Sequence, residues 1–456
     1  MKINGLIAMW DQFALWPHEY FSTLYNSYQH EFKSRILPDR SKIRAFWNAV
    51  SNHPLLDNHP VLDVPHWRER CIPISVHGDG VPVTGVGKSW SKSLDIISWA
   101  SCLAAGTTMG TFNFIFAMFT NIFVKDGGRD TLKQFMVILA WSFECLYLGR
   151  HPDHNWNGDP WPRGSHRWNV RGKPLAGEDE DFLFCMPIIY RGDLDWKYKT
   201  LSLQNYNIAD EPCNECRADS GVHNWKVFRQ DAPSLATCWT TQTWLAAKQP
   251  VRCPLLALSF ASILSVTQDF MHTMHLGIYQ WMLASVLWVL VFNILPNDAA
   301  ANMQTLMNDL NVFWRDNPSL GQGRFRLIRL SMFQGSDSSY PYLKGRAIEL
   351  KRLVKPLKAI WEKYREKRRD HEHYIVHKQI GLMLTKFERL DDILDDHPPQ
   401  LYPCLPEPLG AEFEKCCFDV LQVIQYIHQF YTTNFLLIPR KAVAKPLSIS
   451  QLHVTV

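Results

Sequence analysis

Short apolar runs and glycine-rich breaks alternate in the region between residues 71 and 190. Residues 71–76 are apolar and lead into His-Gly-Asp-Gly, while residues 182–190 are apolar and lead into Arg-Gly-Asp-Leu-Asp. Residues 93–103 and 111–124 form two more strand-like runs. Short apolar runs that end at glycine and aspartate are typical of buried strands. The pattern therefore predicts at least two strands that each end beside an acidic residue.

Longer apolar periodicities predict helices over most of the remaining chain. They fall at residues 1–60, 131–148, 271–314, 341–369, 370–398 and 412–431. Residues 150–181 are dense in Pro, Gly, Asn and Asp, and this composition predicts an exposed loop. Residues 196–250 are also expected to be rich in loops.

The purest apolar run could be mistaken for a membrane span. Residues 281–295 span about 22 Å as a helix, which is short of the roughly 30 Å hydrocarbon core of a bilayer. Extending the run backwards brings in His272 and His275. We therefore expect a helix buried inside a helical domain and no contact with a membrane.

Composition and charge narrow the class of protein. The 456 residues carry 48 Lys and Arg against 44 Asp and Glu, a net charge of +4. This balance excludes a histone-like polycation and an acidic disordered chain. The 11 cysteines are scattered rather than spaced as a disulfide framework, and the N-terminus does not resemble a signal peptide. The sequence predicts a reducing, intracellular compartment.

Three carboxylates stand at the ends of predicted elements. Asp79 follows the first strand, Asp193 follows the later one, and Glu349 lies in a basic helix. Two-metal phosphoryl transfer needs carboxylates held on rigid elements, and Mg²⁺ prefers such oxygen ligands. Asp195 is an alternative to Asp193, and ordinary turn chemistry is the alternative explanation of both Gly-Asp pairs.

Basic side chains surround Glu349 on the same predicted helix. They include Lys344, Arg346, Lys351 and Arg352. Such side chains could contact phosphates beside a catalytic helix, and a solvated basic face is the alternative.

A Cys-x-x-Cys pair lies in the loop-rich region after Asp193. Cys213 and Cys216 have the spacing of two ligands of a structural zinc ion. The other ligands could come from His272 and His275, which are three residues apart. The alternatives are His223, Cys238 and Cys253.

Taken in order, these motifs resemble the DDE transposases of cut-and-paste mobile elements, most closely the CACTA-like group. The motifs that carry the resemblance are Val-His-Gly-Asp-Gly-Val-Pro at 76–82, Ile-Tyr-Arg-Gly-Asp-Leu-Asp at 189–195, the Cys213–Cys216 pair, and Asp-Phe-Met-His at 269–272 followed by Leu-Gly. Glu349 falls where the third acid of that family is expected. The resemblance covers roughly residues 65–370.

The resemblance implies a ribonuclease-H-like α/β core with a mixed sheet, interrupted by a zinc loop and an all-helical insertion. The corresponding divisions are a helical extension at 1–64, the core at 65–270 with the zinc loop at 196–250, the insertion at 271–340, a core helix at 341–370 and a helical extension at 371–456.

In functional terms, the resemblance implies a DNA nuclease and strand transferase in which Asp79, Asp193 and Glu349 bind Mg²⁺. Structural zinc would be held by Cys213 and Cys216 with His272 or His275. The implied partner is double-stranded DNA, at the element ends and at the target, with homo-oligomer formation and nuclear localisation. The alternative is a catalytically inactive DNA-binding protein with the same fold.

Overall fold

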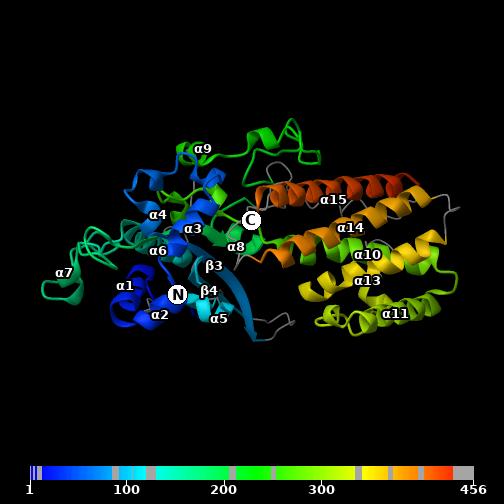
Figure 1. The fold of residues 1–456 in the computed structure, drawn as a ribbon, viewed down its shortest axis with the longest axis horizontal. Helices are drawn as coiled ribbons and strands as arrows, with labels where there is room; N and C mark the ends of the chain where they lie inside the picture. Colours follow the sequence, from blue (N-terminus) through cyan, green and yellow to red (C-terminus); the bar gives the residue numbers. More distant parts are fainter. Residues whose placement is uncertain are drawn as a thin grey trace.

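The computed structural model consists of a half built around a β-sheet and a half built of long helices (Figure 1). It describes residues 2–3, 6–7, 13–84, 92–104, 106–119, 130–204, 212–247, 253–333, 341–367, 373–398 and 405–434. In Figure 1 the sheet half carries the blue and cyan part of the chain, and the helical half carries the yellow, orange and red part.

A four-stranded mixed sheet organises the first half. Its strands are β3 (Cys71–Thr84), β4 (Lys92–Ser101), β5 (Asn113–Phe119) and β6 (Phe184–Arg191), in the spatial order β5-β4-β3-β6. Strands β3, β4 and β5 pair antiparallel, and β6 pairs parallel to β3. A parallel partner requires a crossover, which is provided by α6 (Thr131–Leu148) and the long loop that follows it. The predicted strands are present, and the part of the 111–124 run from residue 120 onward lies outside the described residues.

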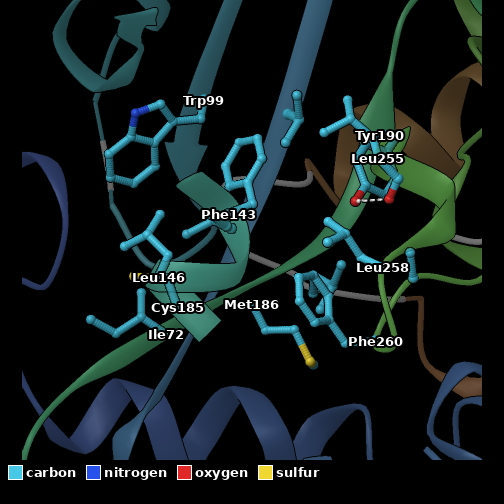
Figure 2. Close-up of a cluster of buried hydrophobic side chains, with 14 of the residues drawn as sticks. Ile72, Trp99, Phe143, Leu146, Cys185, Met186, Tyr190, Leu255, Leu258 and Phe260 are labelled. Atoms are coloured by element: carbon cyan, nitrogen blue, oxygen red, sulfur yellow. Dashed lines mark hydrogen bonds between the residues drawn. The ribbon is translucent and has the colours of Figure 1, made fainter. Parts of the chain in front are cut away.

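The sheet packs against α6 and against the segment around η6 (Pro254–Ala257) (Figure 2). Phe143 and Leu146 of α6 are fully buried against this face, as are Trp99 and Tyr190 from the strands. The Tyr190 hydroxyl donates to the carbonyl oxygen of Leu255 at 3.3 Å. These contacts fix the position of β6, whose last residues lead into the candidate site.

Short helices of the N-terminal region cover the same core. They are α1 (Pro17–Ser27), α2 (Gln29–Arg35), α3 (Ser41–Ala49) and α4 (Trp67–Arg70). His18 of α1 is 1% exposed and its Nδ1 lies 2.8 Å from the Ser142 hydroxyl of α6. Burial, followed by the charges of His151 and Arg167, lowers the pKa of His18 to about 3.

This buried histidine predicts a loss of stability in mild acid. The folded chain keeps His18 neutral while the unfolded chain takes up a proton below about pH 6.5, so stability is full above that pH and falls toward pH 3. We expect this one group to cost up to about 1.4 kcal/mol per pH unit within that window. Urea unfolding at pH 7 and pH 4.5 should show a smaller difference for His18→Gln than for the wild type. His30→Gln is the control, because the His30 side chain is 94% exposed, and it should retain the wild-type difference.

The second half is a bundle of long helices with a core of its own. A continuous helical stretch runs through η8 (Met271–Tyr279), α10 (Gln280–Val289) and η9 (Leu290–Ile294), with π-helical geometry at both ends. It packs with four further helices, α11 (Ala299–Asp316), α13 (Ala347–Glu366), α14 (Tyr374–Asp396) and α15 (Glu407–Asn434). Figure 1 shows α14 and α15 side by side along one edge of this half.

The apolar run at 281–295 lies inside this bundle, as expected. Leu283, Leu287 and Leu290 are fully buried in the bundle core. Among the described residues, one helix, Met271–Ile294, is long and apolar enough to cross a membrane, and 61% of its most apolar window is buried within the protein. The segment therefore serves as the central helix of the bundle.

Shorter elements occupy the regions expected to be loops. They are α5 (Thr108–Thr111), α7 (His166–Val170), α8 (Leu194–Thr200), α9 (Thr241–Ala246) and α12 (Leu330–Phe333). The chain is thus a mixed α/β protein with a four-stranded mixed sheet and a large helical part. Of the region predicted as a zinc loop, residues 205–211 and 248–252 lie outside the described residues.

Candidate functional site

Two aspartates occupy equivalent positions just beyond the stretch in which β3 and β6 pair in parallel, although β3 itself continues past Asp79 to Thr84 beside β4, so Asp79 does not follow the strand as the sequence predicts. The last pair in their register is His77 with Arg191. Each is followed by a glycine and then by an aspartate, Asp79 on β3 and Asp193 after β6. Because the two strands run in the same direction, this register brings the two aspartates to the same edge of the sheet. The repeated strand-then-Asp pattern therefore identifies two neighbouring positions.

The indole of Trp196 explains why glycine precedes both aspartates. A Cβ atom on Gly78 would lie 1.8 Å from Trp196 Nε1, and one on Gly192 would lie 2.3 Å from Trp196 Cε3. Trp196 is 6% exposed, in the first turn of α8. Its ring therefore holds the two strand ends at a fixed distance, and neither glycine can carry a side chain without displacing the ring.

The two acids at 193 and 195 have different surroundings. Asp193 is the N-cap of α8, and its Oδ1 accepts a hydrogen bond from the Trp196 backbone amide at 2.7 Å. Asp195 forms an ion pair with Lys199 at 2.5 Å, and its side chain is 62% exposed. The capping role fixes the Asp193 carboxylate at the strand end, whereas Asp195 faces solvent.

Asp269 and His272 of the Asp-Phe-Met-His motif form a close pair beside these aspartates. The ring Nδ1 of His272 lies 2.7 Å from Asp269 Oδ2, and the His272 amide donates to Asp269 Oδ1 at 3.1 Å. The hydrogen bond to Asp269 raises the pKa of His272 against the effect of burial, and the charges of Asp193 and Asp79 raise it further. Burial alone would raise the pKa of Asp269, but its bonds with His272 lower it. The charges of Asp269, Asp193 and Asp79 therefore all act on the imidazole of His272.

A network of hydrogen bonds between polar side chains connects α8 to the cysteine loop. Lys197 of α8 is 3% exposed, and its Nζ donates to Gln268 Oε1 at 3.0 Å. The Gln268 amide in turn donates to the carboxylate of Glu215. Burial lowers the pKa of Lys197 to about 8, although the charges of Glu215, Asp269 and Asp193 oppose the shift. Sequence spacing could not indicate this hydrogen-bond network, because Lys197, Glu215 and Gln268 lie 18 or more residues apart.

The cysteine pair lies close together, as its spacing predicts. Cys216 Sγ is 3.2 Å from Cys213 Sγ, and both side chains are buried against Trp225. The thiol of Cys216 also hydrogen-bonds with Cys238, and these contacts with Cys213 and Cys238 raise the pKa of Cys216. Cys238 was one of the alternative partners, and it is the one whose sulfur the structure brings to the pair.

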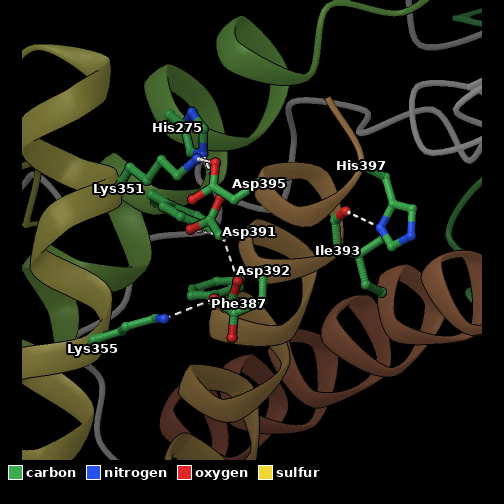
Figure 3. A network of polar contacts seen from close by, with 10 residues as sticks. His275, Lys351, Lys355, Phe387, Asp391, Asp392, Ile393, Asp395 and His397 are labelled. Carbon is green, nitrogen blue, oxygen red and sulfur yellow. Dashed lines mark hydrogen bonds and ion pairs between the residues drawn. The ribbon is translucent and has the colours of Figure 1, made fainter. Parts of the chain in front are cut away.

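Both predicted histidine ligands have carboxylate partners. His272 is bound to Asp269, as described above. His275 is buried in the helical bundle, where its Nε2 lies 2.8 Å from Asp391 Oδ1 of α14 (Figure 3). The hydroxyl of Tyr279 donates to the other carboxylate oxygen of Asp391 at 3.2 Å. This network connects η8 to α14, so the structure gives His275 a place in the bundle core rather than beside the cysteines.

Glu349 begins α13 and is held there by Arg346. Its carboxylate accepts from the Arg346 backbone amide at 2.9 Å and from the guanidinium at 3.0 Å, which forms a capping box. Burial would raise the pKa of Glu349, but these bonds with Arg346 lower it. Glu349 therefore has a capping role in the first turn of α13, whereas the charges of Asp269, Asp193 and Asp79 all act to raise the pKa of His272.

The four basic residues predicted to contact DNA fall into two pairs. Lys344 and Arg346 are exposed at the start of α13. Lys351 forms an ion pair with Asp395 of α14 at 2.5 Å, and its side chain is 18% exposed (Figure 3). Arg352 is partly buried beside it, in a small cavity between α13 and α14. Lys351 and Arg352 therefore take part in contacts between helices, which their sequence spacing could not indicate.

Within the ranges that the structure describes, no group of three or more His, Cys, Asp or Glu side chains is arranged so that it could hold a metal ion. Comparisons with protein-family models, with curated proteins and with solved structures gave no match. A function can therefore be inferred only from the aspartates near the ends of the paired strands, the Asp269–His272 pair and the cysteine loop.

Proposed function

We propose that this chain is a transposase, or a nuclease derived from one, that cleaves and joins DNA phosphodiesters with Asp79 and Asp193 as its metal-binding acids. The observation that carries the proposal is the equivalent placement of these two residues, each two positions beyond the last register pair of the parallel strands β3 and β6. Aspartates on adjacent strand ends of a rigid sheet can share a metal ion.

The strand order supports the ribonuclease-H-like core that the sequence motifs imply. Three antiparallel strands come first along the chain, a helix crosses over, and a fourth strand then pairs parallel to the first. A mixed sheet of this kind is what the motif resemblance implies. Fold alone does not define a function, so the proposal depends on the positions of Asp79 and Asp193.

The residues present fit Mg²⁺ in their chemistry, since carboxylate oxygens are its usual protein ligands. Asp79 is exposed and Asp193 is partly exposed, so both are accessible to a DNA phosphate. Bound Mg²⁺ would polarise the phosphodiester and lower the pKa of an attacking water or 3′-hydroxyl. Within the chain, the Trp196 indole packs against the glycine that precedes each aspartate and so positions both of them.

A third carboxylate has two candidates. The family resemblance implies Glu349, whereas the structure groups Asp269 with Asp79 and Asp193 through their shared effect on His272. Glu349→Gln and Asp269→Asn change each carboxylate to an amide of similar shape. The variant that loses strand cleavage identifies the third acid.

The alternative function is that of an inactive DNA-binding protein with the same fold. A magnesium-dependent nicking assay on duplex DNA, performed with the full chain, separates the two. Cleavage by the wild type that is lost in Asp79→Asn supports the enzyme. Binding without cleavage supports the inactive protein. Nuclear localisation and self-association belong to the same proposal and need their own measurements.

We further propose that the cysteine loop holds a structural zinc ion. The chemistry of the donors fits, because Cys216 contacts both Cys213, at 3.2 Å between the two Sγ atoms, and Cys238, and thiolates are typical zinc ligands. Together with His272, these are the residues that would hold the ion.

For this zinc site, we expect about one zinc ion per chain by elemental analysis. Both Cys216→Ser and Cys238→Ser should reduce the zinc content to near zero and destabilise the loop, because apparent binding energies of structural zinc are about 10–16 kcal/mol. Cys102→Ser is the control, since this cysteine lies at the end of β4 in the sheet half. Unchanged zinc content in Cys216→Ser would contradict the proposal, and a loss in His272→Gln would identify His272 as the fourth ligand.

A further inference from the structure

A groove of about 480 Å³ opens on the helical half, where the chain before α12 meets the start of α13. Four basic side chains and one carboxylate line it, namely Arg326, Arg329, Lys344, Arg346 and Glu349. The two segments are packed closely, because a Cβ atom on Gly345 would lie 2.4 Å from the ring of Phe325, which is 3% exposed. The buried ring of Phe325 therefore packs directly beneath the charged side chains that line the groove.

Most of the positive charge in this groove is not neutralised by the protein. Its one carboxylate, Glu349, is already bound to Arg346. Among the described residues, no carboxylate lies within ion-pair distance of Arg326, Arg329 or Lys344, and all three side chains are exposed. Clustered cations without counter-charges create a positive potential that attracts an anionic ligand.

The lysines in the rest of α13 differ from the basic side chains at the groove, because their positive charge is neutralised by carboxylates. Further along α13, each of four lysines forms an ion pair with a carboxylate of a neighbouring helix. These pairs are Lys351 with Asp395, Lys355 with Asp392, Lys358 with Glu388, and Lys363 with Asp309. Figure 3 shows the first two of these lysines directed toward α14. The four lysines of α13 are therefore neutralised by neighbouring helices, whereas the groove brings together three exposed cations for which no ion pair is found among the described residues.

The groove is connected to the candidate site through one continuous helix. The hydroxyl of Tyr342 donates to Gln280 Oε1 at 2.6 Å, and the amide of Leu343 donates to the Gln280 carbonyl oxygen at 2.9 Å. Gln280 lies about two turns beyond His272 on the continuous helix that begins at Met271. The segment that leads into Lys344 is therefore anchored to the same helix that carries His272.

We propose that this groove binds the phosphate backbone of double-stranded DNA, with Arg326, Arg329 and Lys344 as the contacting side chains. The inference rests on the proposed function and deepens it, because it names the surface that holds the duplex beside the acids. Arginine matches phosphate geometry with two parallel hydrogen bonds, and lysine acts as a point charge. The contacts are independent of base sequence, so the groove positions DNA without selecting its sequence.

The test is binding of a fluorescent duplex to the full chain in EDTA, which prevents cleavage, over a range of salt concentrations. The variant carries Arg326→Gln, Arg329→Gln and Lys344→Gln. Each lost phosphate contact should reduce the salt slope by about 0.9, or roughly 2.7 for three, and weaken binding by about fivefold at 0.15 M salt. We therefore expect a loss of affinity on the order of 100-fold. The matched control is Lys33→Gln with Lys42→Gln and Lys173→Gln, which removes the same charge from exposed positions of the sheet half.

The outcomes separate this inference from the proposed function. Equal affinity and salt slope for the groove variant and the wild type would overturn the groove while leaving the nuclease proposal intact. Equal losses in both triple variants would also overturn it, because only net charge would then matter. A wild type that binds no duplex at low salt would overturn both proposals. A groove variant that binds weakly but still cuts at high DNA concentration supports the groove and the acids independently.

Discussion

We expect Asp79→Asn to lose magnesium-dependent cleavage of duplex DNA while binding DNA as tightly as the wild type or more tightly. The substitution keeps the shape of the side chain and removes the charge that would hold the metal ion. A metal ion at a phosphoryl centre contributes several kcal/mol, so the rate should fall at least about 100-fold. One negative charge near the phosphates also disappears, which favours binding. The measurement is a nicking assay together with duplex binding.

Asp193→Asn should behave in the same way, and its fold should be retained. Asparagine caps a helix about as well as aspartate, so α8 keeps the bond to the Trp196 amide. Asp195→Asn is the matched control, because Asp195 is exposed and forms an ion pair with Lys199, four residues further along α8. Full cleavage in Asp193→Asn, or loss only in Asp195→Asn, would remove Asp193 from the site.

The second large effect that we expect is on the stability of the strand ends. Gly78→Ala places a methyl group where the Trp196 indole lies, 1.8 Å from its Nε1. Because the ring is buried, it cannot move without opening the packing between β3, β6 and α8, and overpacking of this kind costs about 1–3 kcal/mol or more. The free energy of urea unfolding should fall by that amount, and cleavage should fall with it because both aspartates shift.

A double-mutant cycle tests whether the indole is the cause. In a Trp196→Ala background, which alone should cost about 3–5 kcal/mol, Gly78→Ala should add little, because the space is already open. Gly410→Ala is the control, since a Cβ atom there meets nothing within 4 Å. In helix α15 this change should be neutral or stabilise by up to about 1 kcal/mol. Additive costs of Gly78→Ala and Trp196→Ala would show that Trp196 does not couple the strand ends.

Several features of the fold could be predicted because they depend on local pattern. The apolar runs that end in Gly-Asp became β3 and β6, since a buried strand needs continuous apolar residues and glycine permits close approach. The 15-residue apolar run became the central helix of the bundle, because its length and composition suit a buried core helix. The Cys-x-x-Cys spacing likewise predicted the contact between Cys213 and Cys216.

Partner choice across the sequence could not be predicted in this way. His272 and His275 lie three residues apart, yet one pairs with Asp269 and the other with Asp391, 116 residues away. Lys351 has the same basic character as Lys344, but only Lys351 faces a carboxylate of α14. Such pairings depend on how helices pack, and sequence spacing within one helix carries no information about the facing helix.

The sequence by itself therefore determined the four strands of the main sheet in outline and the long helices, and it placed an aspartate beyond each of the apolar runs that form β3 and β6. Periodicity and composition are local properties, so no partner is needed to read them. The tertiary structure decided that β3 and β6 are parallel neighbours, that His272 pairs with Asp269, and that Arg326, Arg329 and Lys344 line one groove. These arrangements arise when separate apolar faces bury against one another, and burial then fixes which distant polar groups must meet.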